Sequence, residues 1–96
     1  MQKLATEALD RLFDVILSLE NREDCYRFFE DLCTVKEMQD LSQRLEVALR
    51  LHNKENYLNI AKATGVSTAT ISRVSRCLNY GSGGYLAAIE KMEEKP

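Results

Sequence analysis

The chain has 96 residues, of which 45% are hydrophobic and 29% charged, with one proline and four glycines. This composition is typical of a single globular domain and excludes a collagen-like, low-complexity or disordered chain. The sequence lacks the roughly 18 uninterrupted apolar residues that a membrane span needs, and its N-terminus lacks the pattern of a signal peptide. We therefore expect one soluble, cytoplasmic domain over residues 1–96.

The residue types that support catalysis or metal binding are few and scattered. Cys25, Cys33 and Cys77 form neither a CxxC pair nor, with the single histidine His52, a zinc-binding spacing. We expect small, buried, reduced thiols, as in a protein of a reducing compartment. A catalytic set of His, Cys or carboxylate side chains is not evident, so the sequence predicts no enzyme, no metal and no cofactor.

The first half of the chain shows apolar residues at spacings of three and four, which predict amphipathic helices. One helix is expected over about residues 3–20, and a second follows Asn21 as its N-cap. Thr34 and Glu37 fit a capping box that opens a longer third helix, whose apolar stripe comprises Met38, Leu41, Leu45, Ala48 and Leu49. These stripes exceed what a thin domain buries by itself, so we expect dimerisation through residues 1–55. The alternative is a monomer whose first helix folds over the rest.

The second half of the chain is also expected to be helical. A polar break at residues 53–56 precedes a short helix that ends at Gly65, and another helix starts after Ser67. Three of the four glycines lie between Tyr80 and Tyr85 and predict a loop, followed by a last helix over about 85–93. Because nothing favours strands, the predicted fold class is all-α with six helices.

Residues 56–79 have the pattern of a helix-turn-helix, which makes demands at fixed spacing. A small residue, Ala61, stands where the second helix would cross the first, and Gly65 permits a turn with positive φ. Ile71 fits the plug between the helices, with apolar flanks at Ile60, Val66 and Val74. We expect residues 80–96 to form a glycine-rich loop and a C-terminal helix beside this motif.

The face that this packing leaves outside is small, hydroxylated and basic. Residues 56–80 carry three basic side chains and no acid, whereas residues 1–33 carry four basic and eight acidic ones. Such a face suits the major groove of double-stranded DNA, read by helix 67–78 of each copy in a homodimer. The alternative is a helix-turn-helix module that docks on another transcription component. The residues predicted to contact DNA are Lys62, Ser67, Thr68, Ala69, Thr70, Ser72, Arg73 and Arg76.

Several of these residues also carry a family resemblance. With Thr34, Leu41, Arg44 and Gly65, the run Ala-Thr-Ile-Ser-Arg at 69–73 resembles the tryptophan repressor superfamily, and the whole chain resembles its TrpR-related YerC/YecD branch in bacteria. The resemblance implies a six-helix fold, an intertwined homodimer and a DNA-binding transcriptional repressor.

The resemblance also implies an effector pocket formed by Thr34, Arg44, Arg73 and Cys77. Two positions depart from the family pattern: Val74 stands in place of a glycine beside the indole ring, and Cys77 in place of the serine that meets the ligand's amino group. We therefore expect that tryptophan is not the effector, and the sequence does not identify another small-molecule corepressor.

Overall fold

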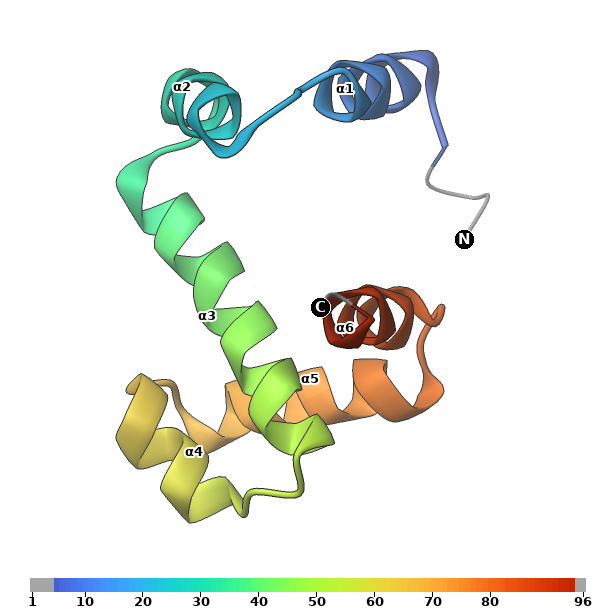
Figure 1. The fold of residues 1–96 in the computed structure, drawn as a ribbon. Coiled ribbons are helices and arrows are strands. Elements are labelled where there is room, and N and C mark those ends of the chain that lie inside the picture. Colours follow the sequence, from blue (N-terminus) through green and yellow to red (C-terminus); the bar gives the residue numbers. More distant parts are fainter. Residues whose placement is uncertain (1–4, 95–96) are drawn as a thin grey trace. The chain divides into compact units, whose positions relative to one another are not determined.

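The structure, a computed structural model, describes residues 5–94, which form six α-helices and no strand (Figure 1). The predicted all-α class is confirmed. The chain groups into two compact units, Met1–Met38 and Gln39–Pro96. No helix among the described residues is long and apolar enough to cross a membrane. The helices are α1 (Glu7–Leu17), α2 (Arg22–Leu32), α3 (Val35–His52), α4 (Tyr57–Thr64), α5 (Thr68–Tyr80) and α6 (Gly84–Glu93).

The first unit contains the two capped helices α1 and α2, neither of which has a buried residue. The Thr6 hydroxyl accepts a hydrogen bond from the Leu9 amide at 3.0 Å, and the Asn21 side chain caps α2 as predicted, at 2.8 Å from the Asp24 amide. Because Thr6 caps α1, this helix is shorter than the predicted 3–20, of which residues 3 and 4 lie outside the described range. No side chain of α1 or α2 is buried, and Leu17 is 81% exposed.

The long helix α3 begins with the predicted capping box. The Glu37 amide donates to the Thr34 hydroxyl at 3.1 Å, while the Thr34 amide donates to the Glu37 carboxylate at 2.9 Å. Further along α3, burial changes along the predicted stripe. Leu41 and Leu45 are 46% and 38% exposed, whereas Ala48 is fully buried and Leu49 packs against the core. Val47, which is also fully buried, was not part of the predicted stripe.

The core lies in the second unit, where α4, α5 and α6 gather around the C-terminal part of α3 (Figure 1). All six buried hydrophobic residues among those described come from these four helices: Val47, Ala48, Ile60, Ile71, Val74 and Ile89. Two of the six belong to α3 and two to α5, and α5 also contacts both α4 and α6. The position of α5 is therefore set by its packing in this shared core.

Two predictions about details of the chain were wrong. The glycine-rich loop is shorter than 80–85, because Tyr80 still belongs to α5 and Gly84 opens α6, so that only residues 81–83 connect the helices. The cysteines are free but not buried: Cys25 and Cys77 are exposed and Cys33 is half-buried. Cys25 belongs to α2, which buries no residue, and Cys77 lies on the outward side of α5.

Candidate nucleic-acid interface

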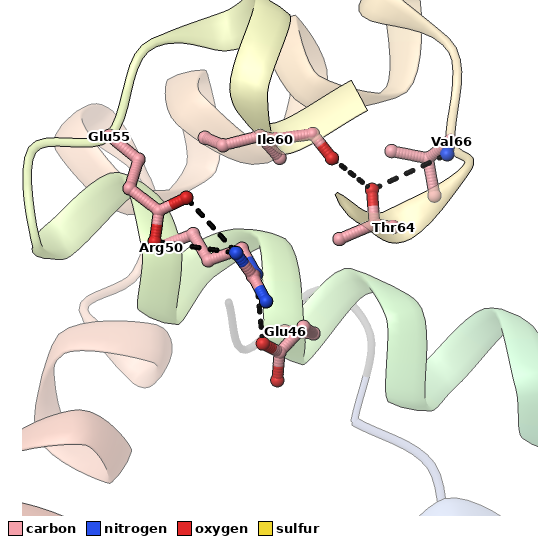
Figure 2. Close-up of polar contacts among 6 residues, drawn as sticks. All are labelled: Glu46, Arg50, Glu55, Ile60, Thr64 and Val66. Atoms are coloured by element: carbon pink, nitrogen blue, oxygen red, sulfur yellow. Dashed lines mark hydrogen bonds and ion pairs between the residues drawn. The ribbon is translucent and has the colours of Figure 1, made fainter. Parts of the chain in front are cut away.

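The turn between α4 and α5 has the backbone conformation that the sequence predicts. Gly65 has φ +76° and donates its amide to the Ala61 carbonyl at 2.9 Å, which ends α4 in a left-handed cap. The Thr64 hydroxyl donates to the Ile60 carbonyl at 2.7 Å and accepts a hydrogen bond from the Val66 amide at 3.4 Å (Figure 2). These bonds fix the direction in which the chain leaves α4.

The two helices of the motif are held together by the residues that the spacing indicated. Ile60 on α4 and Ile71 on α5 are completely buried, and Val74 on α5 is only 1% exposed. Ala61 and Val66 pack against the same cluster as partly buried residues. Residues 57–80 therefore have the helix-turn-helix arrangement expected from the sequence.

The N-terminus of α5 is capped by Ser67. Its hydroxyl accepts a hydrogen bond from the Thr70 amide and donates one to the Thr70 hydroxyl, both at 3.2 Å. Thr70 is half-buried, so its side chain belongs to the cap more than to the open face. The other predicted contact residues are all exposed: Lys62, Ser67, Thr68, Ala69, Ser72, Arg73 and Arg76.

The exposed face of the motif has a uniform electrostatic character. Lys62, Arg73 and Arg76 are its only charged side chains, since residues 56–80 contain no aspartate or glutamate. The unpaired amides at the N-terminus of α5 add partial positive charge next to Ser67. A polyanion would therefore meet small hydroxyl-bearing side chains and cations here, without a carboxylate to repel it.

A cluster behind the motif was missed by the sequence reasoning. The Arg50 side chain of α3 pairs with Glu46 at 2.9 Å and with Glu55 at 3.1 Å (Figure 2). The hydrogen bonds that the Arg50 guanidinium donates to Glu55, and then to Glu46, raise the pKa of Arg50 above its ordinary value, so the guanidinium stays charged. The spacing of Glu46 and Arg50, four residues apart on a predicted helix, was the signal that could have revealed half of this cluster.

A second link lies close to Arg50. The side-chain amide of Gln43 donates a hydrogen bond to the backbone carbonyl of Thr64 at 3.4 Å. Both residues line a hollow of about 380 Å³ between α3 and α4. It is lined by Ser42, Gln43, Glu46, Arg50, Ala63 and Thr64. These contacts connect the turn of the motif to the long helix.

The residues implied as an effector pocket are distributed over both units. Thr34 lies in the first unit, where its side chain serves the capping box. Arg44 on α3 is half-buried, and Arg73 and Cys77 on α5 are exposed. Val74 does not point outward but packs in the core with Ile71 and Ile89. In the described part of the chain, no three His, Cys, Asp or Glu residues are grouped closely enough to hold a metal ion.

Comparisons with known proteins agree with this geometry. A family model described as the Trp repressor protein matches residues 7–93. The uncharacterized protein YerC of Bacillus subtilis is 54% identical over 94 residues, covering 98% of this chain and 90% of its own. A TrpR-like protein from Eubacterium eligens has a similar crystal structure, with a TM-score of 0.93, 50% identity and coverage of 100% and 99% of the two chains. A Trp repressor candidate from Staphylococcus aureus gives a TM-score of 0.92 and 52% identity, with 98% and 94% covered.

Proposed function

Because the chain belongs to the Trp repressor family, we propose that it is a transcriptional regulator that binds double-stranded DNA in a sequence-specific way. In this proposal α5 lies in the major groove, and the protein acts as a repressor. The observation that carries the proposal is the exposed, carboxylate-free face of α5, held by a capped N-terminus and by two buried side chains, Ile71 and Val74. Thr68, Ala69 and Ser72 would approach base edges, where methyl and hydroxyl groups discriminate between bases.

The remaining predicted contacts would serve the phosphate backbone. Lys62, Arg73 and Arg76 supply the cations, and the α5 N-terminus beside Ser67 supplies free amides. Three cations per chain give a modest electrostatic attraction, since phosphate neutralisation dominates affinity for DNA. Tight binding would then require two copies that reach successive major grooves, about 34 Å apart.

Self-association is therefore part of the proposal. The face of α3 that carries Leu41 and Leu45 remains exposed, and so do large apolar side chains of α1 and α2, among them Phe13 and Leu17. Large apolar side chains that a chain leaves exposed in groups are typical of a protein interface. We propose that a second copy covers these side chains, which makes the chain a homodimer with an intertwined N-terminal half.

We infer that tryptophan is not the effector of this protein. Val74, which replaces the family's glycine, is 1% exposed and fills the core beside Ile71 and Ile89. A thiol at Cys77 is a poor hydrogen-bond partner for the ammonium group of an amino acid. Calorimetric titration should therefore give no saturable heat with tryptophan, and a tight saturable signal would overturn this inference.

The test of DNA binding compares arginine variants at several salt concentrations. Replacing Arg73 or Arg76 with Ala should weaken binding to a similar degree for all sequences and reduce the salt dependence by roughly one counterion per chain. The matched control is Arg11→Ala, which removes the same charge from the acidic first unit and should leave binding unchanged. Circular dichroism checks that the helix content of all three variants is that of the parent.

The alternative function, docking on another transcription component, gives a different result. A docking module would show no salt-dependent retention on genomic DNA, and its Arg73 and Arg76 variants would behave like Arg11→Ala. Selection of bound fragments from random duplexes would identify the operator and show whether its half-sites are symmetric. Failure to enrich any sequence would contradict sequence-specific binding.

A further inference from the structure

Helix α4 is attached to α3 by polar contacts at both of its ends. At the N-terminal end, the Arg50 guanidinium binds the Glu55 carboxylate at 3.1 Å and 3.4 Å, and the Arg50 carbonyl accepts the Glu55 amide at 3.1 Å. Glu55 directly precedes Asn56, whose side chain caps α4 at 2.8 Å from the Asn59 amide. The start of α4 is thus fixed to one residue of α3.

At the C-terminal end, the contact runs from Gln43 to the Thr64 carbonyl at 3.4 Å. Thr64 is the last residue of α4 and also braces the turn through its bonds to Ile60 and Val66 (Figure 2). Gln43 and Arg50 are seven residues apart, which is about 10.5 Å along α3. The eight residues of α4 span about 12 Å, so the two attachments match its length and orient it antiparallel to α3.

Arg50 differs from an ordinary surface ion pair. Its side chain is 31% exposed and serves two carboxylates, one on α3 and one in the connecting loop. The pair Arg27–Asp24 lies within a single helix turn, and the Arg27 side chain is 71% exposed. Isolated exposed pairs of that kind contribute little, whereas a half-buried network that joins two elements restricts their relative position.

We propose that Arg50 is a positioning residue for DNA recognition. Its network with Glu46 and Glu55, together with the link from Gln43 to Thr64, sets the orientation of the helix-turn-helix on α3. Since α3 also carries the exposed face of Leu41 and Leu45, the same helix joins the proposed dimer contact to the reading helix. Arg50 thereby determines the separation of the two α5 helices in a dimer and the half-site spacing that the dimer prefers. This inference rests on the proposed function.

The experiment measures the preferred spacing of half-sites. The parent first selects its operator from random duplexes, and duplexes with those half-sites at varied separations are then titrated with Arg50→Met and with the matched control Arg27→Met. We expect Arg50→Met to lose on the order of tenfold in affinity at the preferred spacing and to bind other spacings nearly as well. Arg27→Met should keep the parent's affinity and preference, and Arg50→Lys should recover part of both.

The DNA titrations distinguish a failure of the proposed DNA binding from a failure of the proposed role of Arg50. If the parent shows no salt-dependent DNA binding, the proposed function fails and this inference fails with it. If the parent binds DNA while Arg50→Met keeps the affinity and spacing preference of Arg27→Met, the function stands and the role of Arg50 is overturned.

A second measurement does not depend on DNA. Amide hydrogen exchange over residues 56–66 should be faster in Arg50→Met, and in the milder Glu55→Gln, than in Arg27→Met. Equal protection in all three variants would contradict the positioning role. Because Glu55→Gln keeps a hydrogen-bond acceptor and the volume of the side chain, it remains informative even if Arg50→Met folds poorly.

Discussion

The two units of this chain use similar helices in opposite ways. In the first unit, α1 and α2 are well capped and amphipathic, yet neither buries a single side chain. In the second unit, the short helices α4, α5 and α6 supply four of the six fully buried residues among those described, and α3 supplies the other two. Amphipathicity alone therefore does not indicate where a chain builds its own core.

The difference suggests a division of labour. Side chains buried within the chain hold a helix in one place regardless of any partner, and they lie in the second unit. Apolar side chains left exposed remain available for association, and eight of the thirteen large ones among the described residues lie on α1, α2 and α3. Point substitutions in the two units can test this division.

The core of the second unit is tested by Ile71→Ala. Ile71 is fully buried between α4 and α5, so its truncation should cost about 2–5 kcal/mol of unfolding free energy. Denaturant unfolding followed by circular dichroism gives this value directly. The neighbouring exposed residue provides the control, because Ser72→Ala should change stability by no more than about 0.5 kcal/mol. Equal losses for both would show that α5 is not organised by this core.

The exposed face of α3 is tested by a charge on Leu41 or Leu45. Leu41→Lys or Leu45→Lys should weaken self-association at least tenfold, or about 1.4 kcal/mol, because a lysine ammonium would be placed in an apolar contact. Sedimentation measures the change. Leu58→Lys on α4 is the control, since Leu58 is 65% exposed and lies outside the proposed contact. A parent that remains monomeric at high concentration would contradict the dimer.

The link between α5 and α6 is tested at two neighbouring glycines. A Cβ at Gly81 would collide with the Cys77 carbonyl oxygen, so Gly81→Ala should displace α6 and cost about 1–3 kcal/mol. Gly84 has no atom within 4 Å of its Cβ position and opens α6, so Gly84→Ala should stabilise by about 0.4–1 kcal/mol. Thermal melting of the two variants should therefore shift in opposite directions, and equal shifts would argue against this account of the turn.

Much of the fold could be predicted from the sequence because its signals are local. The capping box of Thr34, the cap of Asn21 and the positive φ of Gly65 each depend on a few adjacent residues. The packing of Ile60, Ile71 and Val74 followed from a motif of fixed spacing. The fold class and the helix-turn-helix motif could therefore be predicted from the sequence alone.

The sequence did not predict which apolar side chains of a helix are buried against other helices of the same chain. Val47 was overlooked because the leucine stripe of α3 was the stronger pattern, although its members Leu41 and Leu45 are exposed. The network of Arg50 was overlooked because Glu55 comes from the loop and meets the guanidinium only after the turn has formed. Periodicity locates apolar faces, but it does not tell a core face from an interface.

The loop that joins α3 to the helix-turn-helix contains one residue with a left-handed backbone. Lys54 has φ +69° and is the only non-glycine residue with positive φ in the described part of the chain. The Lys54 backbone amide donates to the Leu51 carbonyl at 3.0 Å, and the Glu55 amide donates to the Arg50 carbonyl at 3.1 Å. This is the pattern of a Schellman cap, in which glycine is preferred at the left-handed position.

Replacing this residue, Lys54→Gly, should raise the unfolding free energy by about 0.5–1 kcal/mol. The strain of a side chain in the left-handed conformation outweighs the added freedom that glycine gives the unfolded chain. At Asn53, one residue earlier, the backbone has no positive φ, so Asn53→Gly relieves no strain and should lower the unfolding free energy. Denaturant titration of both variants measures the two changes. Stabilisation by both variants would mean that the loop is held less firmly than its hydrogen bonds indicate.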